Sequence, residues 1–147
     1  MINIVKQAMS EDLKPSGDIT TKLIKNNNKI KAKIIAKQNC IIGGLDFAKK
    51  AFKYSDKKTI FKTKVKEGGK VKKGKVVVEV FGKSKSILKS ERVALNFLCL
   101  VSGVATITKK FVDKTNGKSC RICCTRKTMP NLRSLQKYGV KLGGGLN

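Results

Sequence analysis

The stretch that decides the fold is Arg121-Ile122-Cys123-Cys124-Thr125-Arg126-Lys127-Thr128-Met129-Pro130-Asn131-Leu132-Arg133. An apolar run that suits a β-strand ends at Thr125, and two cations follow at once. Thr128 then suits a helix N-cap and Pro130 the first helical turn, so we expect a helix near Asn131 to Leu142. The order of strand, cationic turn and helix N-terminus predicts a strand–helix unit of an α/β protein with an anion site at the turn.

The turn between this strand and this helix offers two kinds of cation. Arg126 carries a planar fork that suits a carboxylate or a phosphate, and Lys127 carries a compact point charge. Together with Thr125, they are the candidate binding residues of this segment. A basic turn beside an ordinary strand–helix unit would give the same local pattern, so both interpretations stay open on these residues alone.

Composition and charge bound the class of protein. The 147 residues are 40% hydrophobic and could bury one ordinary core, or one small domain and a piece of another. The formal net charge of +25 suggests a nucleic-acid partner. Lysines are spread along the whole chain, however, and Trp is absent, so surfaces on which bases could stack are few. A small basic nucleic-acid-binding protein is therefore the alternative and not the preferred interpretation.

Cysteine usage predicts a reduced setting. The five cysteines are odd in number, and the first residues lack the apolar core of a signal peptide, so we expect a cytoplasmic location. Cys120 and Cys123 have the spacing of metal ligands, but the sequence holds no second such pair and no His, so we predict no metal site. Small buried apolar side chains are the preferred interpretation of these cysteines.

The first 115 residues predict an α+β fold. Residues 1–23 suit an N-terminal helix, from Ile2 to Met9, and a turn. Residues 24–115 suit an α+β sandwich, and residues 116–147 suit one further strand–helix unit. The patterns behind the sandwich are strands at 30–36, 40–42, 59–65 and 76–81, a short helix at 45–53, a hairpin or tight turn at 67–74, and a long helix from Ile87 to a stop at Asn116-Gly117.

The long helix contains the longest uncharged stretch, residues 93–108. Its sixteen residues fall short of a membrane span and include polar side chains, so we expect a buried helix and no membrane partner. The small residues Ser102, Gly103 and Ala105 would let another element approach this helix closely.

Two charged features stand apart from this pattern. The adjacent Glu11 and Asp12 could bind a metal or do acid–base work, although near a chain terminus such pairs are more often solvated. Arg92 follows Glu91 early in the long helix, where an exposed ion pair would contribute little. The functional interpretation makes Arg92 an anion-binding fork at the edge of a domain or subunit.

Four blocks of sequence, taken together, carry a family resemblance. They are Glu11-Asp12-Leu13 with Gly17-Asp18-Ile19-Thr20-Thr21; Glu91-Arg92-Val93-Ala94-Leu95-Asn96; Thr125-Arg126-Lys127-Thr128 with Leu132-Arg133 and Leu135-Gln136-Lys137-Tyr138; and Gly143-Gly144-Gly145-Leu146-Asn147. In this order and spacing the chain resembles the quinolinate phosphoribosyltransferases, also called carboxylating nicotinate-nucleotide pyrophosphorylases.

The resemblance implies that residues 24–115 form an α/β open sandwich and that residues 116–147 form the first strand–helix unit of an incomplete α/β barrel. It also implies that the complete enzyme works as a homodimer. It implies transfer of phosphoribose from phosphoribosyl pyrophosphate to quinolinate with Mg²⁺, releasing pyrophosphate and carbon dioxide in NAD biosynthesis. Arg92 would reach into the neighbouring subunit's site, and Arg126 and Lys127 of the block that begins at Thr125 would help hold the anionic substrates.

The sequence departs from the family pattern at its end. In the family, the glycine run is followed by Asn-His-Arg and then most of the barrel, whereas this sequence ends at Asn147. We therefore expect the metal ligands and remaining site residues to lie outside these 147 residues, we assign no catalytic residue, and we expect no turnover by these residues alone.

Overall fold

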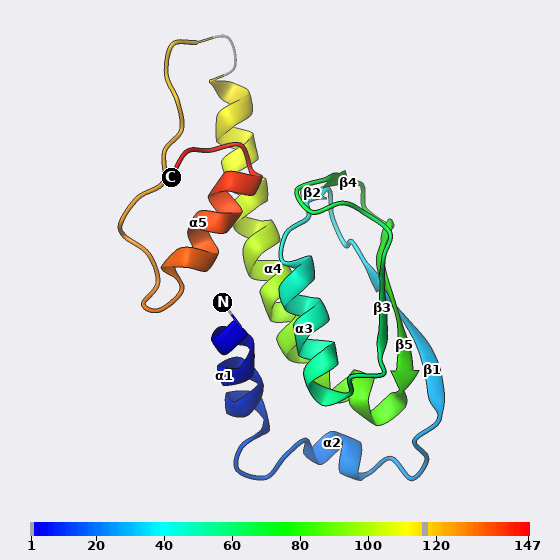
Figure 1. Ribbon diagram of the computed structural model, residues 1–147. Coiled ribbons are helices and arrows are strands. Elements are labelled where there is room, and N and C mark those ends of the chain that lie inside the picture. The colour runs from blue at the N-terminus through cyan, green and yellow to red at the C-terminus, as the bar shows by residue number, and fades with distance from the viewer. Residues whose placement is uncertain (1, 116–117) are drawn as a thin grey trace. The chain divides into compact units, whose positions relative to one another are not determined.

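The computed structural model describes residues 2–115 and 118–147 (Figure 1). The chain groups into two compact units, one of Met1–Ile35, Leu45–Lys64 and Val76–Phe97, and one of Ala36–Gly44, Val65–Lys75 and Leu98–Asn147. The predicted α+β class is confirmed. The elements are α1 (Ile2–Leu13), α2 (Ile19–Lys22), β1 (Lys29–Ile35), β2 (Cys40–Ile41), α3 (Leu45–Ser55), β3 (Ile60–Thr63), β4 (Lys70–Val71), β5 (Val76–Lys83), α4 (Ser84–Lys114) and α5 (Arg133–Leu142).

The first unit is built on an antiparallel sheet with the strand order β1-β5-β3. Val78 and Val80 of the central strand are fully buried, and α3 lies with the first half of α4 on one side of this sheet (Figure 1). Phe47 of α3 stacks on Phe97 of α4 with ring centroids 5.3 Å apart. Helix α1 packs against α3 and buries Met9 completely.

The other face of this sheet is rich in lysine. Glu79 of β5 forms ion pairs with Lys31 at 2.7 Å and with Lys64 at 2.9 Å. Hydrogen bonds from these two ammonium groups lower the pKa of the Glu79 carboxyl to about 2. One acid thus offsets part of the repulsion among cations on this face, which explains how a lysine-rich β1 is tolerated in the sheet.

Most sequence-predicted elements are confirmed, with shifted ends. The three long strand patterns form β1, β3 and β5. In the turn region 67–74, β4 pairs with the distant β2. The predicted end of the first helix at Met9 is wrong, because helical bonding continues beyond it: the Lys14 N–H donates to the Ser10 carbonyl at 3.1 Å. Asp12 therefore lies on a helix and not in a turn.

The predicted long helix is confirmed as α4, while its predicted stop at Asn116-Gly117 lies outside the described residues. By length and composition α4 could cross a membrane. This is weak evidence, since the core helix of a soluble protein passes the same test. Within α4, Val93 and Ala94 are buried in the first unit, and Val101 and Ala105 in the second.

In the second unit, α5 packs closely on α4 through glycines. A Cβ on Gly139 would lie 2.8 Å from the Val104 Cβ, and a Cβ on Gly143 would lie 2.5 Å from the Ala105 carbonyl oxygen. The prediction that small residues of α4 admit a close neighbour is confirmed for Ala105. It is wrong for Gly103, where an added Cβ would meet nothing within 4 Å.

Gly143 and Gly103 make a matched pair for a stability test. Gly143→Ala is expected to lower the free energy of unfolding by about 1–3 kcal/mol, because the new methyl group would force α5 off the α4 backbone. Gly103→Ala is expected to raise it by about 0.5–1 kcal/mol, because alanine restricts the unfolded chain and suits a helix interior. Urea unfolding of both variants measures the difference. Equal effects would show that α5 does not pack on α4 in this way.

Candidate anion-binding site

The segment that leads into the cationic turn is not a regular strand. The strand predicted near Arg121 to Thr125 is wrong as a full element, since the segment forms only an isolated parallel bridge between Cys123 and Leu146. The Cys124 N–H donates to the Leu146 carbonyl at 2.8 Å, and the Leu146 N–H donates to the Ile122 carbonyl at 2.9 Å. A strand needs a longer ladder than this, yet the bridge is parallel, as the predicted barrel would require.

The helix after the turn begins later than predicted. Asn131 has φ of 63°, and the Leu132 N–H donates to the Met129 carbonyl at 3.1 Å. With Pro130 before Asn131, this has the residue pattern of a type II turn, which a helix cannot continue through. Helix α5 therefore starts at Arg133, with Leu132 as its N-cap and no side-chain cap. The prediction of Thr128 as the N-cap is wrong.

Three side-chain hydrogen bonds hold the cationic loop, residues 125–132. Thr125 Oγ1 accepts from the Lys127 N–H at 3.1 Å. The Met129 N–H donates to Gln136 Oε1 at 2.9 Å. Thr128 Oγ1 accepts from the Nε–H of Arg133 at 3.3 Å. Two of these bonds come from the first turns of α5, so the helix fixes the loop that precedes it.

Thr125, Arg126 and Lys127 lie together in this loop and are all exposed. The guanidinium and ammonium groups are thus available to an anion, and the loop backbone that carries them is already ordered. An ordered loop binds at a lower entropic cost than a loose one. The arrangement suits recognition of carboxylate or phosphate groups.

A second contact, which no sequence pattern predicted, fixes α5. Glu67 Oε1 accepts hydrogen bonds from the Gly44 N–H at 2.6 Å and from the Tyr138 hydroxyl at 3.0 Å. The role of Gln136 of α5 in holding the cationic loop was also not predicted. The signal for Gln136 is weak: its amide can reach back over the turn that precedes a helix. For Glu67 no local pattern gives a signal, because its partners are distant in sequence.

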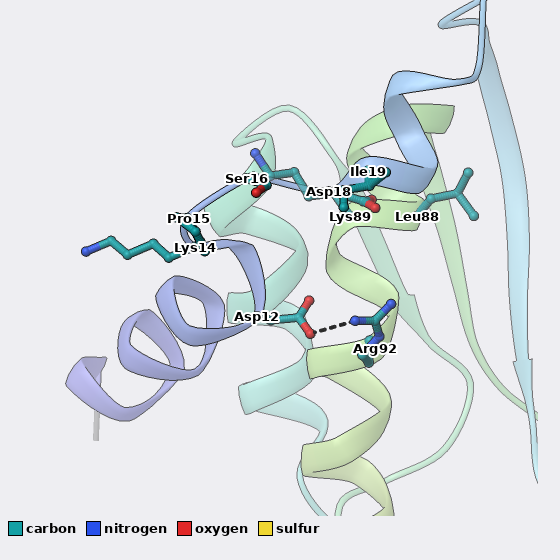
Figure 2. A pocket seen from close by; sticks show the side chains of 10 residues that line it. Asp12, Lys14, Pro15, Ser16, Asp18, Ile19, Leu88, Lys89 and Arg92 are labelled. Carbon is teal, nitrogen blue, oxygen red and sulfur yellow. Dashed lines mark hydrogen bonds and ion pairs between the residues drawn. The ribbon is translucent and has the colours of Figure 1, made fainter.

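Arg92 belongs to the first unit, whereas the cationic loop belongs to the second. Arg92 does form an exposed ion pair, but its partner is not the neighbouring Glu91. Arg92 Nη1 instead donates to Asp12 Oδ1 at 3.0 Å, a contact from α4 to α1 (Figure 2). Asp12 is also not simply solvated, since its side chain is only 20% exposed.

The ion pair of Arg92 and Asp12 borders a cleft of about 420 Å³. The turn from Lys14 to Ile19 forms one side of it, and Leu88, Lys89 and Arg92 of α4 form the other. In Figure 2, Lys14 extends away from Arg92. Arg92 is 70% exposed, so its ion pair contributes little to stability, about 0–1 kcal/mol.

The cysteines do not behave as predicted. The prediction of buried apolar side chains is wrong for Cys120 and Cys123, which are both exposed. Of the other cysteines, Cys99 is exposed, and Cys40 and Cys124 are half-buried. The segment that holds Cys120 and Cys123 forms one isolated bridge and no sheet ladder, which leaves these two side chains uncovered. Burial raises the pKa of the Cys40 thiol, and nearby Cys99 raises it further. Among residues 2–115 and 118–147, no group of three or more His, Cys, Asp or Glu side chains could hold a metal ion.

Two family models match the chain in order. The model of the quinolinate phosphoribosyl transferase N-terminal domain matches residues 18–102, and that of the C-terminal domain of the same enzymes matches residues 104–147. The first match alone spans more than half of the chain. The chain therefore belongs to the quinolinate phosphoribosyltransferase family.

Individual relatives agree with this assignment. The chain is 37% identical over 132 residues to a probable carboxylating nicotinate-nucleotide pyrophosphorylase of Bacillus subtilis, covering 90% of this chain and 46% of the relative. It is 40% identical, over an alignment of 149 residues, to a protein of the same name from Methanocaldococcus jannaschii, with 98% and 50% covered. The chain spans about half the length of the curated relatives it matches.

Solved structures give the same result. The nicotinate-nucleotide pyrophosphorylase of Francisella tularensis has a TM-score of 0.94 and 34% identity, with 99% of this chain and 52% of that chain covered. NadC of Streptococcus pyogenes has a TM-score of 0.92 and 33% identity, with the same coverage. The fold is thus that of the first half of these enzymes.

Proposed function

We propose that this chain supplies the first half of an enzyme that transfers phosphoribose from phosphoribosyl pyrophosphate to quinolinate, a step of NAD biosynthesis. The quinolinate nitrogen attacks the ribose carbon, and the bond from that carbon to pyrophosphate breaks. The neighbouring carboxylate leaves as carbon dioxide, and a proton takes its place on the ring to give nicotinate mononucleotide. The observation that carries this proposal is the ordered cationic loop in a chain of this family.

In this proposal, the loop binds negative charge. Arg126 grips a substrate carboxylate or phosphate with two hydrogen bonds, while Lys127 adds a point charge. Thr125 keeps the loop closed through its bond to the Lys127 N–H. Fixed cations of this kind hold the reactants in line and favour charge that develops on pyrophosphate and on the ring during decarboxylation.

Mg²⁺ is proposed to accompany phosphoribosyl pyrophosphate. The described residues do not offer a ligand set for it, since they contain no cluster of three acidic, His or Cys side chains. The phosphate oxygens of the cosubstrate are suitable ligands of their own. We therefore derive no step through the metal from the residues of this chain.

We further propose that the complete enzyme is a cytoplasmic homodimer in which Arg92 serves the site of the neighbouring subunit. An exposed guanidinium next to a cleft fits such a role, because the side chain contributes little to its own subunit's stability. The nucleic-acid-binding alternative receives no support from the two relatives described above, both of which carry enzyme names.

The proposed function is tested with Arg126→Lys in a polypeptide that joins these 147 residues to the second half present in the relatives. The change keeps the charge and removes the planar fork, so kcat/KM is expected to fall by about 10- to 150-fold, equivalent to about 1.5–3 kcal/mol. Formation of nicotinate mononucleotide measures the rate. Arg121→Lys, a change of the same kind at another exposed arginine, is the matched control and is expected to stay within about twofold of the unchanged enzyme. Equal rates for both variants would remove Arg126 from the site.

A further inference from the structure

The acidic pair Glu11-Asp12 near the end of α1 has no role in the function proposed so far. A carboxylate in the last turn of a helix lies at the negative end of the helix dipole, which disfavours it. The helix itself therefore does not account for an acid at this position. For Asp12, the structure offers a partner that does account for it, the guanidinium of Arg92.

The two acids differ in how they are placed. Asp12 follows the fully buried Met9 by three residues, which puts both on the same face of α1. Met9 packs in the core of the first unit, so the backbone that carries Asp12 is anchored there. The Asp12 side chain is 20% exposed, whereas Glu11 is an exposed residue that points elsewhere on the helix. The carboxylate of Asp12 is thus held in place next to the long, flexible side chain of Arg92.

The geometry of the contact leaves Arg92 able to bind. Asp12 accepts from Nη1, so the bond does not use the edge formed by Nε and Nη2. That edge can still give two parallel hydrogen bonds to a carboxylate or a phosphate. An arginine side chain loses much rotational freedom when it binds, and one existing bond removes part of that freedom beforehand.

We propose that Asp12 is a positioning residue for Arg92, holding the guanidinium so that its Nε–Nη2 edge faces a substrate anion. The inference rests on the proposed function of Arg92. A competing effect exists, because a carboxylate near a binding arginine also repels an anionic substrate. The two effects predict opposite changes in affinity when Asp12 is neutralised, so the sign of the change decides between them.

The test uses Asp12→Asn in the complete enzyme, with Glu11→Gln as the matched control. Asp12→Asn is expected to raise the KM for quinolinate by about five- to tenfold with kcat changed less than about twofold, as for an interaction made equally in ground and transition states. Glu11→Gln removes the same charge one residue earlier and is expected to change neither. A lower KM for Asp12→Asn would overturn the proposal in favour of competition, and an unchanged KM would overturn it outright.

A charge swap separates positioning from a merely structural ion pair. The double variant Asp12→Arg with Arg92→Asp restores an attractive pair between α1 and α4 but moves the guanidinium onto the wrong helix. It is expected to unfold at the same urea concentration as the unchanged enzyme. Its KM for quinolinate is expected to stay as high as that of Asp12→Asn. Recovery of the low KM on swapping would overturn positioning.

Two further readouts keep this inference distinct from the proposed function. If Arg92→Ala leaves the KM for quinolinate unchanged, the proposed role of Arg92 fails. If Arg92→Ala raises it and Asp12→Asn does not, only the positioning role fails. In the complete enzyme, NMR relaxation of the assigned Arg92 Nε–H bond should show restricted motion that Asp12→Asn releases. Equal motion of this bond in the unchanged protein and in Asp12→Asn would contradict the positioning of Arg92 by Asp12.

Discussion

Mixing two inactive full-length variants, Arg92→Ala and Arg126→Ala, is expected to restore activity. If the site of one subunit takes Arg126 from its own chain and Arg92 from its partner, a heterodimer of the two variants has one intact site and one site with both lesions. With statistical exchange between symmetric dimers, half of the dimers are mixed, so roughly a quarter of all sites are intact. Nicotinate mononucleotide formation should then rise from near zero to about that fraction of the unchanged enzyme's rate.

This experiment needs proof that subunits exchange. Differently tagged variants allow the heterodimer to be isolated and its amount measured. The control is each variant mixed with a tagged copy of itself, which should stay inactive. If heterodimers form and activity does not return, Arg92 acts in its own subunit or in none, and the shared site is wrong.

The sequence predicted the first unit well because its elements carry strong local patterns. Strand β1 alternates lysine with apolar residues, and the structure places Lys31 and Lys33 on the exposed face. Helix α4 has an apolar run that suits a core helix over many turns. In both cases the local pattern alone was sufficient to predict the element.

The site was predicted only in part, because its order depends on contacts that no local pattern encodes. The cationic turn itself follows from Arg126 and Lys127 in sequence. The predicted helix includes Asn131, whose left-handed backbone places it in the turn before α5. The bond from the Met129 N–H to Gln136 and the ion pair of Arg92 with Asp12 join residues that are 7 and 80 positions apart in the sequence.

A polypeptide of these 147 residues alone is expected to give no measurable nicotinate mononucleotide. The parallel bridge of Cys123 with Leu146 leaves the neighbouring backbone groups of that segment without a sheet ladder in the described structure. On the same unit, Ile107, Phe111 and Leu146 are 53%, 56% and 44% exposed, which favours self-association. The described residues also offer no metal cluster.

The measurement compares this polypeptide with the one that carries the second half of the relatives, at equal concentration and with Mg²⁺ present. Product above the blank for the 147 residues alone would refute the prediction, because it would mean that the loop around Arg126 suffices for turnover. Light scattering on the same samples reports association. We expect the short polypeptide to form oligomers despite its charge of +25, because exposed apolar side chains and unpaired strand edges outweigh repulsion at physiological salt. A monodisperse monomer would show instead that repulsion among the lysines prevails.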